Sequence, residues 1–311
     1  MNVYYKDYAE YLAEIFPGTK VQKISVNAGF GCPNRDGTIG TGGCIYCNNA
    51  SFSPSYCLEE ANNGISAQLE KGKGFFGRKY PQMKYLAYFQ SFTNTYTGKR
   101  LHSENVDNIT SLRELYLEAL GVEDVVGLVI GTRPDTFDEK IAKMLGEINE
   151  KSPVFVEFGV ESSSDATLKL INRGHTFQQT RDAVALAASV GLHAGVHVIA
   201  GLPGEGDEGI LKTVRECCEL PIESIKIHHL QVIRDTTLSR LWHAGEMSPK
   251  IFEVDEYIKL CSKLVDIIPS RIAIERFLAS APPAMVEAPK WGLKNYEFVN
   301  KLHAYLKKSI R

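Results

Sequence analysis

The sequence reads VFVEFGV at residues 154–160, TFQQTRDAVALAASVG at 176–191 and HAGVHVIAG at 193–201. The first and third stretches are short, apolar and rich in β-branched residues, which is typical of buried strands. The middle stretch has apolar residues at helical spacing and opens with Thr176 and Gln179, a capping-box pair. A strand, a helix and a second strand in this order predict two parallel strands joined by a crossover helix.

The same alternation extends in both directions along the chain. Further strand-like runs are KISVNAG (23–29), KYLAYFQ (84–90), VVGLVIG (125–131) and SIKIHHLQVI (224–233), with helical patterns between them. Six parallel strands that are almost wholly apolar have both faces covered, and they are too few for a closed eight-fold barrel. The predicted fold is therefore α/β, an open partial (β/α)6 TIM-like barrel with its active site at the carboxyl ends of the strands.

We divide the chain into three parts. Residues 1–21 form an N-terminal helical lead, residues 22–244 form the partial-barrel core, and residues 245–311 form a C-terminal α/β extension that covers the cavity. Within the extension we expect a helix at 254–268, a short strand RIAIERF at 271–277 and a final helix at 289–308.

Composition narrows the class of protein. The 311 residues are 44% hydrophobic and 23% charged, as in soluble globular proteins, and no apolar run approaches the length of a membrane span. The first residues lack the pattern of a signal peptide, so we expect a cytoplasmic protein whose thiols stay reduced. A cysteine cluster then indicates a metal site rather than disulfides. The net charge of -2 predicts no general affinity for polyanions.

Three of the seven cysteines lie in the loop GFGCPNRDGTIGTGGCIYCNNASF (29–52), as Cys32, Cys44 and Cys47 with the spacing C-x11-C-x2-C. One interpretation is a [4Fe–4S] cluster on three thiolates, whose fourth iron is open to S-adenosylmethionine. A second adds Cys57 and gives a four-thiolate site, either zinc or a fully ligated electron-transfer cluster. A third is a set of unrelated core cysteines. The open cluster accounts best for the glycine-rich loop with one close cysteine pair, and it gives the Tyr46 ring an adenosyl group to pack against.

The loop is similar to the signature of the radical S-adenosylmethionine (SAM) superfamily, with the first gap widened. The stretches IGTRPD (130–135), VEFGVESSSDATLKLINRGHT (156–176) and HVIAGLPGE (197–205) resemble the elongator catalytic subunit and oxygen-independent coproporphyrinogen oxidase. The stretches YFQSFTNTY (88–96) and APKW (288–291) resemble YhcC/YtqA-type bacterial radical SAM proteins. The resemblance covers residues 22–235. It implies a [4Fe–4S] cluster that cleaves SAM to a 5′-deoxyadenosyl radical, which takes a hydrogen atom from the substrate.

The resemblance also implies the SAM contacts. Glu161 falls where a side chain binds the ribose, and Arg173 falls where an arginine pairs with the methionine carboxylate, chemistry that suits both groups. The loop after the second strand lacks the Gly-Gly-Glu pattern of the superfamily. The remaining residues implied as cofactor contacts are Tyr46, Gln90, Ser91, His197 and Gln231.

Candidates for substrate contact are polar residues near strand ends, and each of them is also compatible with structural ion pairing. We expect Arg133, Arg234 and Glu275 to act on the substrate, and the further candidates are Asp135, His228, His229 and Arg276. Resemblance to the YtqA type implies conversion of 5-carboxymethylaminomethyluridine at the tRNA wobble position to the aminomethyl form, with an arginine on the carboxylate. A small-metabolite substrate and a non-catalytic iron–sulfur or zinc protein that transfers electrons or binds RNA remain alternatives.

The segment KGKGFFGRKYPQMKY (71–85) interleaves cations with aromatic rings, which suits a polyanion with stackable bases. It is a candidate landing surface for tRNA, and a solvated loop is the alternative. The chemistry also implies a flavodoxin- or ferredoxin-type electron donor. The sequence does not indicate an oligomeric state.

Overall fold

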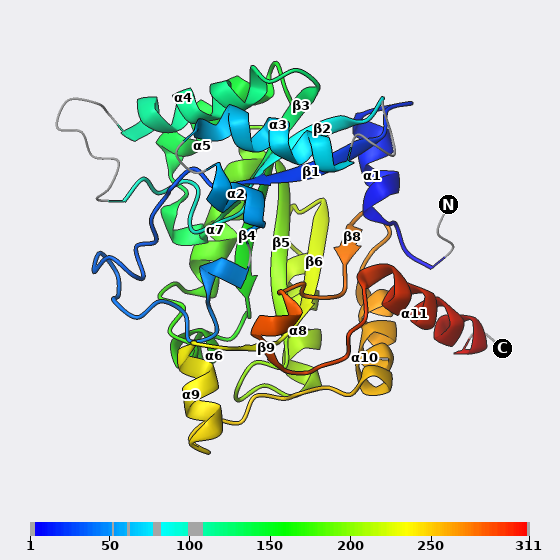
Figure 1. Cartoon of the computed structure of the whole chain (residues 1–311). Coiled ribbons are helices and arrows are strands. Elements are labelled where there is room, and N and C mark those ends of the chain that lie inside the picture. Colours follow the sequence, from blue (N-terminus) through cyan, green and yellow to red (C-terminus); the bar gives the residue numbers. More distant parts are fainter. Residues whose placement is uncertain (1–3, 52, 61–62, 77–81, 99–107, 310–311) are drawn as a thin grey trace.

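A parallel seven-stranded sheet forms the centre of the computed structural model, which describes residues 4–51, 53–60, 63–76, 82–98 and 108–309 (Figure 1). The strand order is β1-β2-β3-β4-β5-β6-β8, so neighbours in the sheet follow one another along the chain. The strands are β1 (Val21–Val26), β2 (Lys84–Phe89), β3 (Val125–Thr132), β4 (Val154–Glu161), β5 (His193–Ala200), β6 (Ser224–His229) and β8 (Ala273–Arg276).

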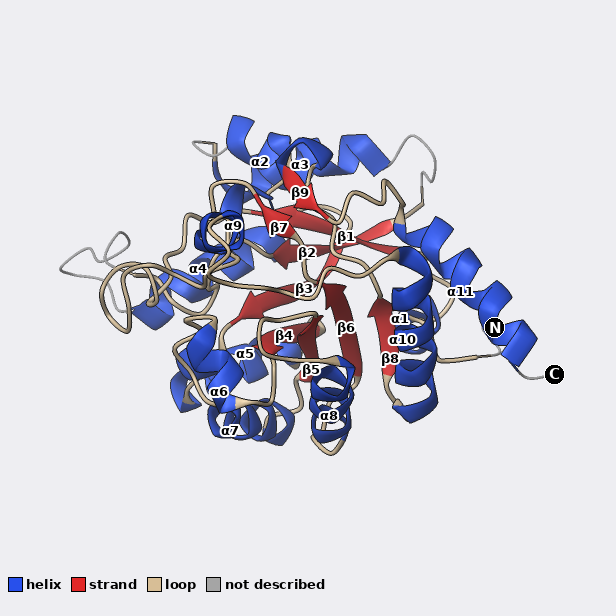
Figure 2. Ribbon diagram, turned by 90° about the horizontal axis from the view of Figure 1, so that it is seen from below, coloured by secondary structure: helices blue, strands red, loops and turns tan. Residues whose placement is uncertain are grey.

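Helices cover the outer face of the curved sheet (Figure 2). The apolar side of each helix packs on the sheet and forms one continuous core, in which residues such as Leu145, Val184 and Val214 are fully buried. These helices are α2 (Ser55–Glu59), α3 (Gly64–Phe76), α4 (Asn108–Leu120), α5 (Glu139–Asn149), α7 (Phe177–Ser189), α8 (Asp207–Cys218) and α10 (Val254–Ile267). The capping box predicted at Thr176 and Gln179 opens α7.

The partial-barrel fold predicted from the sequence is confirmed, with two corrections to its strands. The stretch 271–277, expected in the extension, supplies β8, which pairs with β6 as a seventh parallel strand. The stretch 224–233 is not one strand, because the chain leaves the sheet after His229. Its last residues form β7 (Val232–Ile233), which pairs antiparallel with β9 (Val286–Ala288).

The short helix α1 (Tyr8–Ile15) closes the amino end of the half-barrel. Tyr11 on α1 donates a hydrogen bond from its hydroxyl to Glu223, which lies just before β6. The Tyr11 ring also makes an edge-to-face contact with Phe155 near the start of β4. The main chain just before α1 pairs with β8, since the Ile274 amide donates to the Lys6 carbonyl. The segment before α1 is thus joined to β8, the edge strand of the sheet.

The remaining elements lie at the carboxyl end of the sheet or beyond β8. They are the short helices η1 (Asn49–Ser51), η2 (Pro134–Thr136), α6 (Asp165–Leu170), α9 (Thr237–His243) and η3 (Pro283–Met285), and the final helix α11 (Asn295–Ser309). Among the helices in the described part of the chain, none has the length and apolar character that crossing a membrane requires. The division into lead, core and extension stays a prediction.

Candidate active site

A cavity opens at the carboxyl ends of the strands, where the fold class predicts the active site. Its walls come from the cysteine loop, from the ends of β2 to β6 and from the turn before α7. Ten of the expected site residues line it together, and the further candidates His228 and His229 line it as well: Cys32, Cys44, Tyr46, Cys47, Gln90, Arg133, Glu161, Arg173, His197 and Gln231 are the ten. Residues up to 199 positions apart in the chain therefore meet at one site.

Three of the expected site residues do not line this cavity. The Ser91 side chain is buried and its hydroxyl lies 2.6 Å from that of Ser53. Arg234 lines a separate polar pocket. The Glu275 carboxylate is 2.7 Å from the Lys23 ammonium and 3.0 Å from the Lys226 ammonium, so structural ion pairing accounts for its position.

The cysteine loop is held by its own turns, and Cys57 lies apart from it. The Cys47 amide donates to the Cys44 carbonyl at 3.0 Å, which closes the turn between the close pair. Cys57 is 1% exposed, its thiol lies 3.3 Å from the Ser25 carbonyl oxygen, and burial raises its pKa to about 12. The geometry therefore groups three thiols and leaves the fourth as a protonated core residue.

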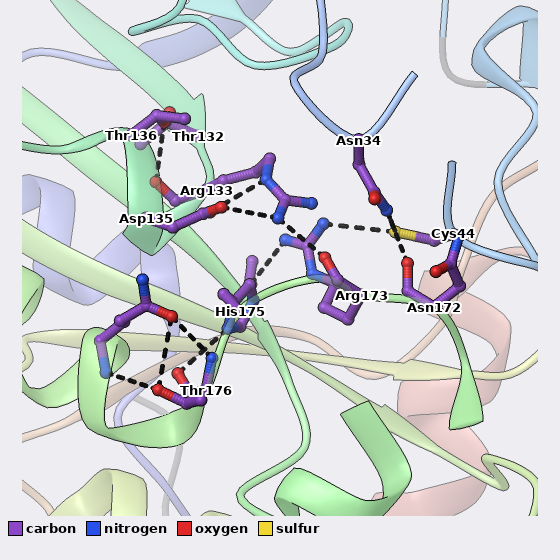
Figure 3. A network of polar contacts seen from close by, with 12 residues as sticks. Asn34, Cys44, Thr132, Arg133, Asp135, Thr136, Asn172, Arg173, His175 and Thr176 are labelled. Carbon is purple, nitrogen blue, oxygen red and sulfur yellow. Dashed lines mark hydrogen bonds and ion pairs between the residues drawn. The ribbon is translucent and has the colours of Figure 1, made fainter. Parts of the chain in front are cut away.

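Arg173 reaches from the turn before α7 to the cysteine loop (Figure 3). Its Nη1 donates to the Cys44 sulfur at 3.5 Å, and its Nη2 donates to the Gly159 carbonyl at 2.7 Å. The buried Nε has no hydrogen-bond partner among the described residues. Burial alone would lower the pKa of Arg173, but Cys44, Tyr46 and Glu161 raise it well above its ordinary value, so the guanidinium stays charged.

Glu161 lies at an irregular point of the sheet. The pairing of β4 with β5 shifts register between Gly159 and Glu161, and Glu161 has a left-handed φ of 67°. A bulge of this kind re-aims a side chain, and a left-handed non-glycine residue is a strained one that often marks a functional site. A Cβ on Gly159 would lie 2.6 Å from Arg173 Nη2 and 2.8 Å from Glu161 Oε1, so a side chain at position 159 would displace the ends of these two side chains.

Neutral histidines form the inner part of the cavity. Burial, followed by the charge of Lys226, lowers the pKa of His197, and its Nε2 lies 2.8 Å from Glu157. Burial lowers the pKa of His229 to about 3, and burial with Arg276 holds the pKa of His228 well below its usual range. At neutral pH these rings therefore act as directed hydrogen-bonding groups and not as charges.

The sequence model of the Radical SAM superfamily matches residues 26–217, and that of the Radical_SAM C-terminal domain matches residues 222–308. The chain belongs to the radical SAM superfamily. It is therefore a radical SAM enzyme, and the cofactors of its class are a [4Fe–4S] cluster and S-adenosylmethionine.

Three known proteins illustrate what the chain is similar to. Protein YhcC of Escherichia coli is 33% identical over 93% of this chain and 88% of its own length. A tRNA uridine(34) acetyltransferase of Methanocaldococcus infernus is 30% identical over 59% of this chain and 33% of its own length. The solved structure of M. infernus Elp3 has a TM-score of 0.65 at 22% identity, and the match covers 94% of this chain and 63% of that one, which shows a shared fold.

The side chains present fit the radical SAM cofactors. Within the described ranges, no group of three or more His, Cys, Asp and Glu side chains converges on a single metal ion. A cubane differs because each thiolate reaches its own iron, so its ligands surround a space. Arg173 beside Cys44, and Arg35 donating to the Cys47 carbonyl at 2.8 Å, place positive charge where thiolates would gather. Cys32, Cys44 and Cys47 would hold the cluster.

Sequence reasoning missed several residues of the site. Glu157 accepts hydrogen bonds from His197 and Lys226 at 2.8 Å each, and Lys23 also pairs with it. Burial alone would raise the pKa of Glu157, but Lys226 and Lys23 hold it well below its usual range. The sequence feature that could have pointed to Glu157 is its position as a charged residue inside the apolar run VFVEFGV. Asn34 and Arg35 come two and three residues after Cys32, yet nothing in their spacing indicates a contact.

The basic aromatic segment 71–85 lies away from the cavity where it is described. Lys73 donates to Glu70 and to the carbonyl of Glu123, which precedes β3, so it lies at the amino ends of the strands. Lys84 pairs with Asp124 at the same end. Arg78, Lys79 and Tyr80 lie outside the described residues.

Proposed function

We propose that this radical SAM enzyme modifies the wobble uridine of tRNA, removing the carboxymethyl group of 5-carboxymethylaminomethyluridine to leave the aminomethyl form. When bound, the cluster and SAM supply a carbon radical that can take a hydrogen atom from an unactivated C–H bond. The similarity to an enzyme named for uridine 34 of tRNA supports this substrate class. A flavodoxin- or ferredoxin-type protein would supply the electron.

The environment of the Arg133 guanidinium is the observation that supports the proposal most directly. Its side chain lines the cavity, and two hydrogen bonds to Asp135, at 2.9 and 2.8 Å, hold the guanidinium in one orientation. The Nη1 atom is buried and has no partner among the described residues. A buried donor without a hydrogen-bond partner costs free energy, so a ligand that offers an acceptor to Nη1 would gain binding free energy there. The carboxylate of the modified uridine is such an acceptor.

The remaining walls suit a nucleoside. Neutral His228 and His229 line the cavity and offer hydrogen bonds without charge, which is what the edge of a uracil base requires. These side chains would orient the base, while Arg133 holds the carboxylate.

A small-metabolite substrate remains the second candidate, because one observation favours it. Lys71, Lys73 and Lys84 each lie beside an acidic side chain, so these cations of the 71–85 segment are partly neutralised. A paired lysine contributes less to the counterion release that drives binding to nucleic acid.

Nucleoside mass spectrometry of tRNA from a strain that lacks the gene tests the proposal. We expect the carboxymethylaminomethyl nucleoside to accumulate and the aminomethyl nucleoside to disappear. The wild-type gene should restore the product, and a Cys47→Ala gene should not. An unchanged nucleoside profile, together with no stimulation of 5′-deoxyadenosine formation by hypomodified tRNA in vitro, would refute the tRNA substrate and favour the metabolite.

A further inference from the structure

The side-chain amide of Asn34 is buried and lies within hydrogen-bonding reach of two acceptors. Asn34 is 1% exposed, and its Nδ2 lies 2.6 Å from the main-chain oxygen of Asn172 and 3.8 Å from the Cys44 sulfur (Figure 3). A carboxamide nitrogen carries two hydrogens, so one can point to each acceptor. The contact to sulfur is long for a free thiol. On a cluster the same sulfur carries negative charge, and hydrogen bonds to charged acceptors are shorter and stronger.

A reciprocal set of contacts holds this amide in place. The Gly43 amide donates to the Asn34 carbonyl at 2.7 Å, and the Asn172 side chain donates to the Gly43 carbonyl at 2.8 Å. The turn that holds Asn172 also carries Arg173, whose Nη1 reaches the Cys44 sulfur at 3.5 Å. Two N–H donors from different parts of the chain therefore meet at one cysteine sulfur.

The absence of a side chain at Gly40 leaves room for the Asn34 amide beside the Cys44 sulfur. A Cβ at position 40 would lie 2.5 Å from Asn34 Oδ1, which is closer than real contacts allow. Any side chain at this position would displace the Asn34 amide. The glycine-rich part of the loop thus permits a close approach of backbone to the amide.

We propose that Asn34 is a positioning residue for the cluster, one that donates to the Cys44 sulfur and thereby raises the reduction potential of the cluster. Reduction adds an electron whose charge spreads over the irons and sulfurs, so an N–H donor stabilises the reduced form more than the oxidised form. The inference concerns the cofactor alone and stands whether the substrate is tRNA or a metabolite.

Asn34→Ala tests the proposal in anaerobically reconstituted protein, with the midpoint potential read by a redox titration followed by electron paramagnetic resonance. We expect the cluster to become roughly threefold to tenfold harder to reduce, which is about 30 to 59 mV for a one-electron couple. Only loaded chains give the signal, so incomplete loading does not disturb the reading. A potential equal to that of the wild type would overturn the proposal.

Asn172→Gly is the matched control. Asn172 has a φ of 53°, which glycine tolerates, and the change removes the side-chain bond to Gly43 while leaving the Asn34 donor in place. We expect a potential near that of the wild type. A shift as large as that of Asn34→Ala would mean that loop attachment, and not donation to sulfur, sets the potential.

Two further variants decide the question if Asn34→Ala fails to assemble a cluster. Asn34→Asp keeps the shape of the side chain, removes the donor and adds negative charge, so the potential should fall further. Gly40→Ala displaces the amide without changing its chemistry, so it should also lower the potential. Wild-type potentials in both would refute the assignment.

Discussion

Replacement of Arg173 by alanine should weaken the binding of SAM while the cluster is retained. Arg173 is 7% exposed, and its guanidinium donates hydrogen bonds to the Gly159 carbonyl and the Cys44 sulfur. Its Nε has no partner among the described residues and its side chain lines the cavity. The predicted partner for the open donors is the methionine carboxylate of SAM.

The size of the effect follows from the kind of bond. A hydrogen bond to a charged group contributes about 1.5–3 kcal/mol, and each 1.4 kcal/mol is a tenfold change in affinity. We therefore expect the dissociation constant of SAM to rise roughly 10- to 150-fold in Arg173→Ala. Arg173→Lys keeps the charge but loses the planar fork, so it should give a smaller rise.

Isothermal titration calorimetry of SAM into anaerobically reconstituted protein measures this change, with iron content determined on the same samples. Arg181→Ala is the matched control, because Arg181 packs over the Phe177 ring on α7 and does not line the cavity. Its dissociation constant should equal that of the wild type. An Arg173→Ala protein with full iron content and unchanged SAM affinity would refute the reasoning.

Four other outcomes are expected. Alanine at Cys32, Cys44 or Cys47 should abolish the roughly four irons of one reconstituted cluster, whereas Cys57→Ala should keep them; equal losses by iron assay would restore the four-thiolate interpretation. Gly159→Ala should raise the dissociation constant of SAM by calorimetry, because the new Cβ would lie 2.6 Å from Arg173 Nη2; unchanged binding would show that this contact is not needed. Burial lowers the pKa of His175 and His229 from an ordinary 6.5 to about 3. Between pH 6.5 and about 3 the unfolded chain therefore binds more protons than the folded chain, and the free energy of unfolding decreases as the pH is lowered. Urea denaturation at stepped pH should show that His229→Gln removes about 1.4 kcal/mol per pH unit of this slope, and an unaltered slope would contradict the buried neutral ring. The double variant Lys71→Ala, Lys73→Ala should reduce the slope of log K against log salt concentration for any tRNA binding by less than about 0.7 per lysine, because both lysines lie near glutamates. A larger reduction of this slope in binding titrations would restore the segment as a landing surface for tRNA.

Most of the fold was predictable because its signals are local. Strands β4 and β5 are short, largely apolar runs, and the crossover helix α7 between them has its own periodicity and a cap at Thr176. The cysteine spacing and the stretch around residues 156–176 were likewise sufficient to predict the superfamily and its cofactors. These features need only neighbouring residues, so a single sequence contains them.

Only the tertiary structure decided which segments meet. The strand at 273–276 adds to β6, and the end of the sixth predicted strand leaves the sheet to pair with β9. The same long-range pairing carries Glu275 into an ion pair with Lys23 and Lys226. It also places Asn34 between the Cys44 sulfur and the turn at Asn172. Such contacts join residues far apart in the chain, and their geometry depends on strand order and register, for which local composition has no signal.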